Sequence, residues 1–165
     1  MGVLLSDSGV EAGGSGSRDA AALAVALTRA GQTIELSAMW SHDLIGSRQS
    51  ALADVAWPEA RLDLERLITE VQDLTTDQLA RVGLTGAQLE MKLSGLEYAG
   101  SRAAEEISRR RWRPARKWFI RFAGWLNSLL GSLLKEVPIA GEILKEFKEH
   151  LENAAADRVL EEAVE

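Results

Sequence analysis

Hydrophobic residues recur every three or four positions over most of the chain, which is the spacing of one face of an α-helix. After Pro58, apolar residues repeat in this way through residues 59–74 and predict a helix that begins at the proline. The same spacing returns in residues 86–107, and again in residues 138–163, where charged residues fill the other positions. The pattern predicts an all-α protein, a single bundle of about five or six helices.

The expected helix ends are marked by capping residues. Residues 19–31 suit a short helix with Asp19 near its N-cap and Gly31 as its C-terminal stop. Two capping-box patterns follow, Thr75 with Gln78 and Thr85 with Gln88, and Gly83 between them is expected to end the first of these two helices. Residues 32–57 are less regular. We predict helix there, with a brief strand over residues 33–36 as the alternative.

Length and composition indicate one domain. The chain has 165 residues, 46% of them hydrophobic, which is enough for one core. Residues 1–17 are rich in glycine and serine and predict a disordered tail, because they offer too little apolar area to offset the entropy of ordering. We therefore expect a helical-bundle domain over residues 18–165.

Charge is divided unevenly along the chain. Residues 108–135 contain eight basic and no acidic side chains, although the whole chain has a formal net charge of −6. Pro114 and Pro138 are expected to interrupt helices, because proline lacks the backbone N–H. We expect a basic aromatic helix over residues 109–137 and an acidic helix over residues 138–163.

A helical wheel of the basic aromatic segment separates its residues into two faces. Cations lie on one side, and Trp118 and Trp125 lie on the boundary between the two sides. The opposite side is apolar: Trp112, Phe119, Phe122, Ala123, Leu126, Leu129, Leu130, Leu133 and Val137. On the polar side, the small residues that follow Arg121 would let another helix approach closely: Gly124, Ser128, Gly131 and Ser132.

This segment admits three interpretations. In the first it is an ordinary bundle helix, whose cations pair with Glu142, Glu146 and Glu149 of the last helix. In the second, residues 112–137 lie on an anionic membrane and perturb it without spanning it. The uncharged run of residues 122–134 is shorter than the roughly 20 residues that a transmembrane helix needs.

In the third interpretation, which we favour, residues 109–125 form a docking surface for an acidic partner. The concentrated positive charge is self-repelling unless an anionic group meets it. The expected partner is a protein with an acidic surface or another copy of the chain, with an anionic membrane surface as the alternative. The expected binding residues are Arg109, Arg110, Arg111, Trp112, Arg113, Arg116, Lys117, Trp118, Arg121 and Trp125.

Catalytic chemistry finds little support. Without cysteine the chain has no thiol nucleophile or thiolate metal ligand, and this composition suits a reducing compartment such as the cytoplasm. Ser41, His42 and Asp43 are adjacent and cannot align as a triad, and His150 is too isolated for a metal site. We expect a non-catalytic interaction or regulatory protein without cofactor or metal, located in the cytoplasm, with the membrane periphery as the alternative location. Nucleic acid is not an expected partner, because acids flank the basic block.

Overall fold

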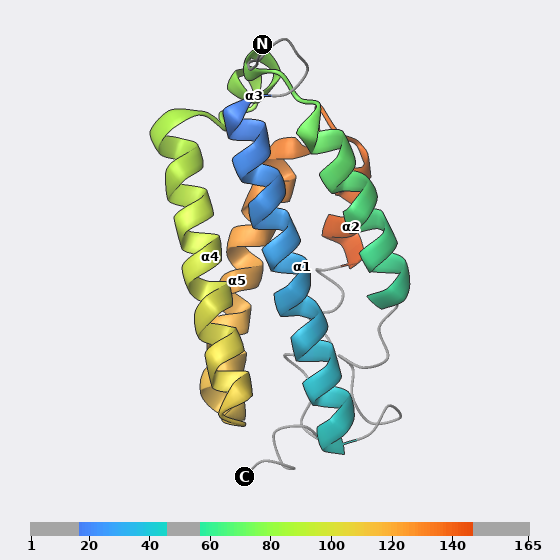
Figure 1. Ribbon diagram of the computed structural model, residues 1–165, viewed down its shortest axis with the longest axis vertical. Coiled ribbons are helices and arrows are strands. Elements are labelled where there is room, and N and C mark those ends of the chain that lie inside the picture. Colours follow the sequence, from blue (N-terminus) through green and yellow to red (C-terminus); the bar gives the residue numbers. More distant parts are fainter. Residues whose placement is uncertain (1–16, 46–56, 147–165) are drawn as a thin grey trace, which may run out of the picture.

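The computed structural model describes residues 17–45 and 57–146, and these residues contain six helices and no strand. Five have printed labels in Figure 1: α1 (Arg18–Ile45), α2 (Trp57–Gln72), α3 (Thr76–Arg81), α4 (Gly86–Ser108) and α5 (Trp112–Leu133). A sixth helical segment begins at residue 139 and is described to residue 146. The predicted all-α bundle is confirmed. Residues 1–16 of the predicted tail lie outside the described residues.

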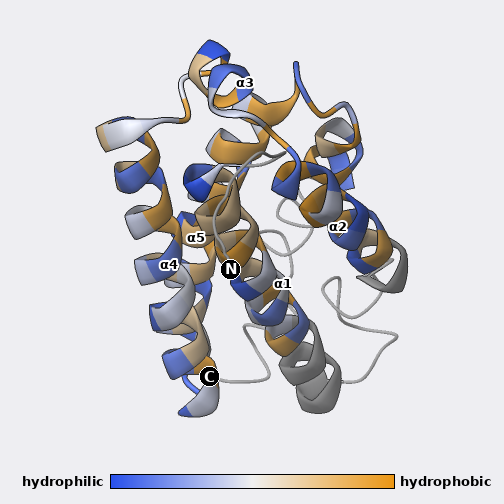
Figure 2. Ribbon diagram, turned by 45° about the horizontal axis from the view of Figure 1, so that its top comes forward, coloured by the Kyte–Doolittle hydropathy of each residue, from blue (hydrophilic) through white to orange (hydrophobic). Residues whose placement is uncertain are grey.

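The helices pack around one core. α4 and α5 form an antiparallel pair, α1 packs against both α2 and α4, and α3 closes the end of the bundle where α1 begins (Figure 1). Figure 2 shows the hydrophobic sides of the long helices turned toward one another. The largest fully buried side chains are Phe122, Leu23, Leu27, Leu67, Leu79, Leu84, Leu96, Leu126, Leu129, Leu130 and Leu133.

α1 corrects two expectations. Ser17 is its cap, because the Ser17 Oγ accepts a hydrogen bond from the Ala20 N–H at 3.0 Å. The helix then continues through Gly31, so the predicted stop at Gly31 and the alternative strand over residues 33–36 are both wrong. A Cβ on Gly31 would stand 2.9 Å from the Leu64 Cδ2, so this glycine serves the close contact between α1 and α2. The part of the irregular segment over residues 46–56 lies outside the described residues.

Of the two predicted capping boxes, one is present and the other is absent. At α3 the box is complete, because the Gln78 N–H donates to the Thr75 Oγ1 at 3.1 Å and the Thr75 N–H donates to the Gln78 Oε1 at 2.9 Å. Gly83 then ends this turn with φ +73°, as predicted. Thr85 is the N-cap residue of α4 but makes no side-chain capping hydrogen bond, so the second predicted box is wrong.

α4 and α5 approach closely because α4 presents glycine to the rings of α5. A Cβ on Gly95 would overlap the indole of Trp125, and a Cβ on Gly100 would stand 3.1 Å from the Phe122 ring. The small residues of α4 thus admit a neighbouring helix, and this neighbour is the basic aromatic helix.

The predicted helix over residues 109–137 is too long at both ends. Arg109, Arg110 and Arg111 form the turn between α4 and α5, where the Arg111 N–H donates to the Glu106 carbonyl at 3.0 Å and the Arg110 N–H to the Ile107 carbonyl at 2.9 Å. This is the hydrogen-bond pattern of a Schellman motif, and Arg110 occupies its left-handed position with φ +56°. Pro114 lies in the first turn of α5, where a backbone N–H has no helical partner to lose.

At its other end α5 stops at Leu133, and the chain turns before Pro138. The expected acidic helix over residues 138–163 is helical in its described part, residues 139–146. Ile143 and Ala140 of this part are buried in the core. The remaining residues of that prediction lie outside the described residues.

Candidate functional site

The apolar face of α5 is the centre of the core. Every residue that the wheel placed on this face and whose side chain is described is buried: Phe119, Phe122, Ala123, Leu126, Leu129, Leu130, Leu133 and Val137. The side chain of Trp112 lies outside the described part. α5 thus has one face closed inside the bundle and an opposite face that carries the cations.

Two of the expected binding arginines are held by α4. The Arg111 Nε donates to the Glu106 Oε1 at 2.8 Å and its Nη2 to the Glu106 Oε2 at 2.9 Å, and this carboxylate is only 2% exposed. Arg109 pairs with Glu105 at 3.0 Å. The carboxylates that neutralise these two arginines therefore come from the preceding helix, and the pairs fasten the corner between α4 and α5.

Trp118 lies under a group of cations. The guanidinium carbons of Arg121 and Arg102 stand 4.8 Å and 5.3 Å from the centre of its ring, and the Lys117 Nζ stands 6.0 Å away. The edge of Tyr98 meets the indole at 5.4 Å between ring centroids. Cations over an indole face are stabilised by about 0.5–1 kcal/mol each when exposed. The half-buried Trp118 therefore organises charge at the surface.

Arg102 and Tyr98 were missed by the sequence analysis. They lie four residues apart on α4, and that spacing places them on one face of the helix. Which neighbour this face meets depends on the register between α4 and α5, and the helical pattern of α4 alone does not give it.

The remaining cations are presented outward. Arg110, Lys117 and Arg121 are exposed, and no carboxylate of the residues described here forms a salt bridge with any of the three. A shallow depression of about 470 Å³ lies along the surface of α5. It is lined by Arg113, Arg116, Lys117, Ile120 and Arg121. We call the following residues the basic aromatic surface: Tyr98, Arg102, Arg110, Lys117, Trp118, Ile120 and Arg121.

Of the other expected binding residues, Trp125 is the one that packs inward. Its indole is half-buried and fills the space over Gly95 of α4. Arg113 is exposed and Arg116 is half-buried, both on α5. The structure thus brings Lys117 and Arg121 of α5 together around Trp118 and assigns Trp125 to the contact between helices.

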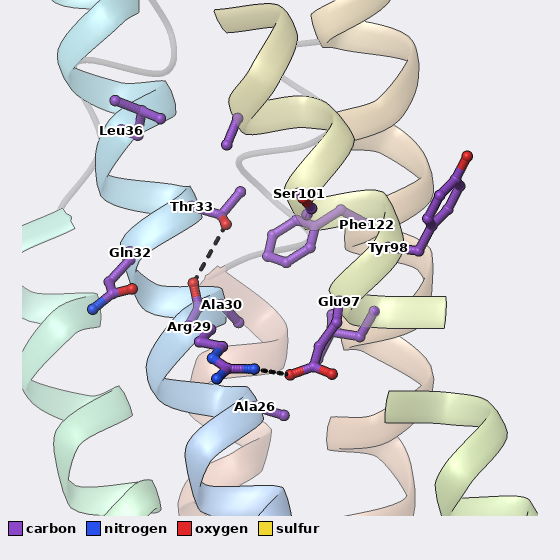
Figure 3. Close-up of a pocket in the computed structure, with 13 residues that line it drawn as sticks. Ala26, Arg29, Ala30, Gln32, Thr33, Leu36, Glu97, Tyr98, Ser101 and Phe122 are labelled. Carbon is purple, nitrogen blue, oxygen red and sulfur yellow. Dashed lines mark hydrogen bonds and ion pairs between the residues drawn. The ribbon is translucent and has the colours of Figure 1, made fainter. Parts of the chain in front are cut away.

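A separate groove of about 570 Å³ lies between α1 and α4 (Figure 3). The ring of Phe122 points into it from α5, and Thr33 and Ser101 line it from the two sides. The Arg29 Nη1 donates to the Glu97 Oε2 at 2.7 Å, which ties α1 to α4 across the groove. Besides this ion pair, its lining combines apolar and small residues with the polar side chains of Gln32 and Tyr98.

The structure adds no support for a catalytic triad, a metal site or a membrane span among the described residues. Ser41, His42 and Asp43 follow one another along α1, and their side chains, like His150, are outside the described part. Over the described ranges, no group of three or more histidine, aspartate or glutamate side chains is arranged to hold a metal ion. Nor does any helix in those ranges combine the length and apolar character that crossing a membrane requires.

Comparison with known proteins adds no relative. No protein-family model matches the chain, and neither a curated protein nor a solved structure is significantly similar to it. The function must therefore be inferred from the basic aromatic surface itself.

Proposed function

We propose that this protein is a non-catalytic interaction module that docks an acidic protein partner on the basic aromatic surface. The observation that carries the proposal is the outward group of Arg110, Lys117 and Arg121, for which no described carboxylate provides an ion pair. Lys117 and Arg121 both lie over the ring of Trp118, and cations this close repel one another, so an anionic partner relieves that repulsion.

Arg110 gives independent support. It stands at a left-handed position, φ +56°, where glycine costs less than any residue with a Cβ. Its side chain is exposed, so no packing within the described bundle offsets this cost. A strained cation at the edge of a cationic surface is consistent with a role in binding.

The membrane alternative draws less support from the same geometry. An amphipathic helix binds a bilayer through its apolar face, and the apolar face of α5 is in the core. Insertion of residues 112–137 would therefore require the bundle to open. We accordingly favour a cytoplasmic protein that meets a protein partner, and we keep contact with an anionic lipid surface as the competing outcome.

The test is a matched pair of charge reversals in the full chain. Lys117→Glu with Arg121→Glu inverts the basic aromatic surface, and Arg18→Glu with Arg66→Glu makes the same change in net charge at exposed positions of α1 and α2. Binding to poly-glutamate and to phosphatidylserine vesicles is measured for each variant at low and at physiological salt. Exposed charges act within about 8 Å at physiological ionic strength, so binding should weaken as salt rises.

We expect the wild type and the α1/α2 control to bind poly-glutamate, and the α5 reversal to bind it at least tenfold more weakly. Equal binding by the two reversed proteins would contradict the proposal. Binding to vesicles with no binding to poly-glutamate, lost in the α5 reversal, would replace the protein partner with a membrane surface.

A further inference from the structure

From Ile120 onward, the outer face of α5 carries a seam with the spacing of a coiled coil. Ile120, Gly124, Asn127, Gly131 and Leu134 follow one another at alternating intervals of four and three residues. This is the repeat by which one helix presents a continuous face to another. The seam lies on the opposite side of α5 from Leu126, Leu129 and Leu133, which are in the core.

The two ends of the seam are exposed apolar side chains. Ile120 is 45% exposed and Leu134 is 41% exposed, and both are among the few large hydrophobic residues that are exposed in the described part of the chain. Between them the two glycines are uncovered, because outside their own helix no described atom lies within 4 Å of the place where a Cβ would stand on Gly124 or on Gly131, and Asn127 is half-buried. The seam thus has two apolar anchors and a flat middle.

The glycines of α4 differ from those of α5 in what lies over them. A glycine inside a helix costs about 1 kcal/mol relative to alanine. In α4 packing inside the fold offsets that cost, since the rings of Trp125 and Phe122 occupy the space over Gly95 and Gly100. In α5 no described residue occupies the space over Gly124 and Gly131, so packing within the described fold does not offset this cost, and a helix that packs onto the seam would offset it. The Oδ1 of Asn127, at the middle of the seam, is buried and has no hydrogen-bond partner among the described residues.

Cations flank the seam along its length. Lys117 and Arg121 lie beside its first turns, the Lys92 Nζ of α4 donates to the Ser128 Oγ at 2.7 Å beside its middle, and Lys135 is exposed at its end. α5 itself has no acidic residue. The span from Lys117 to Lys135 is about 27 Å at the helical rise of 1.5 Å per residue.

We propose that the partner is an acidic α-helix of another protein, which packs along the seam from Ile120 to Leu134. This inference rests on the proposed function and names the shape of the partner. The partner helix has small residues at its middle, apolar residues that meet Ile120 and Leu134, and carboxylates that face Lys117, Arg121 and Lys135. Small residues on both helices let the axes approach to about 8 Å.

The probe is a pair of alanine-rich helical peptides of identical composition, about five turns long. In the first, two leucines stand at the seam positions and glutamates flank them, whereas in the second the same residues are scrambled around the helix. Dissociation constants for the full chain are measured by titration calorimetry. We expect the patterned peptide to bind at least tenfold more tightly than the scrambled one.

Variants of the chain locate the contact. Ile120→Ala with Leu134→Ala should weaken binding of the patterned peptide at least tenfold, and Leu62→Ala, which removes a still more exposed leucine from α2, should leave it unchanged. A second variant, Gly124→Leu with Gly131→Leu, should weaken binding while the protein stays folded, because leucine is a better helix former than glycine.

Three outcomes overturn the inference, and they differ from a failure of the proposed function. Equal binding of the two peptides, with poly-glutamate binding still lost on Lys117→Glu and Arg121→Glu, would leave the acidic partner and reject the helical mode. If the wild-type chain binds neither poly-glutamate nor the patterned peptide, both the proposed function and the helical mode are rejected. Self-association of the unliganded chain that Ile120→Ala and Leu134→Ala abolish would make a second copy the occupant.

Discussion

At the scale of single residues, Arg110 combines a structural cost with an exposed charge. Its φ of +56° lies in the left-handed region that favours glycine, and its N–H closes the Schellman motif at the end of α4. We predict that Arg110→Gly raises the free energy of unfolding by about 1 kcal/mol, measured by chemical denaturation. Arg110→Ala, which keeps a Cβ, should bring no such gain. A loss of stability in Arg110→Gly would contradict the claim that the backbone at Arg110 is strained.

Glu106 is the residue on which the corner between α4 and α5 depends. It is buried and accepts two hydrogen bonds from Arg111, with an Nη2 of Arg102 at 3.6 Å. We predict that Glu106→Gln lowers the free energy of unfolding by about 1–3 kcal/mol, because a buried charge-assisted pair is replaced by an incompletely paired amide.

The neighbouring Glu105 is the control for that change. It forms salt bridges with Arg102 at 2.9 Å and Arg109 at 3.0 Å, but its side chain is 39% exposed. Exposed pairs contribute at most about 1 kcal/mol, so Glu105→Gln should be nearly neutral in the same denaturation experiment. Equal effects of the two substitutions would show that the burial of Glu106 has no energetic consequence.

At the scale of elements, the same residue type has opposite consequences on the two helices of the α4–α5 pair. Gly95→Ala should destabilise the protein by about 1–3 kcal/mol, because the new Cβ would overlap Trp125. Gly124→Ala should stabilise it by about 1 kcal/mol, because the added Cβ meets nothing in the described structure and alanine favours the helix. Thermal unfolding of the two variants tests both signs. A stabilising Gly95→Ala would mean that the two helices do not pack as closely as described.

Much of the element level could be predicted from the sequence. The apolar stripes of residues 59–74 and 86–107 and the box of Thr75 with Gln78 predicted helices that the structure contains. The error at Gly31 has a physical cause, since a glycine can occupy two kinds of position in a helix. It can end the helix or admit a neighbour, and only the position of Leu64 on another helix decides between them.

The two faces of α5 could be predicted from the sequence, but the contacts that α4 makes with the candidate site could not. The helical period of α5 alone separated its core face from its cationic face, which the burial of Phe122 and Leu126 confirms. The partners of Trp118 and Arg111 come from α4, and a contact between helices is not encoded in the period of either one. Arg102, Tyr98 and Glu106 were therefore missed as parts of the site and its support.

At the scale of the whole molecule, the bundle divides the roles of one amphipathic helix. The hydrophobic effect closes the apolar face of α5 in a single core, to which α1 and α4 contribute their own apolar faces. The ion pairs of Arg109 and Arg111 then fix the corner with α4, while Lys117 and Arg121 stay on the outside. A docking surface for an acidic helix follows as a proposal from this division.

The most direct test of that division uses the fact that the chain contains no cysteine. Ala123 is fully buried, and the adjacent Gly124 is exposed on the seam. Single variants Ala123→Cys and Gly124→Cys are treated with a thiol reagent under native conditions, and their reaction rates are compared with those of the unfolded chains. We predict that Gly124→Cys reacts at close to the unfolded rate and that Ala123→Cys reacts on the order of 100-fold more slowly, because it must wait for local opening. Comparable rates, or a slower Gly124→Cys, would contradict the outward position of this face.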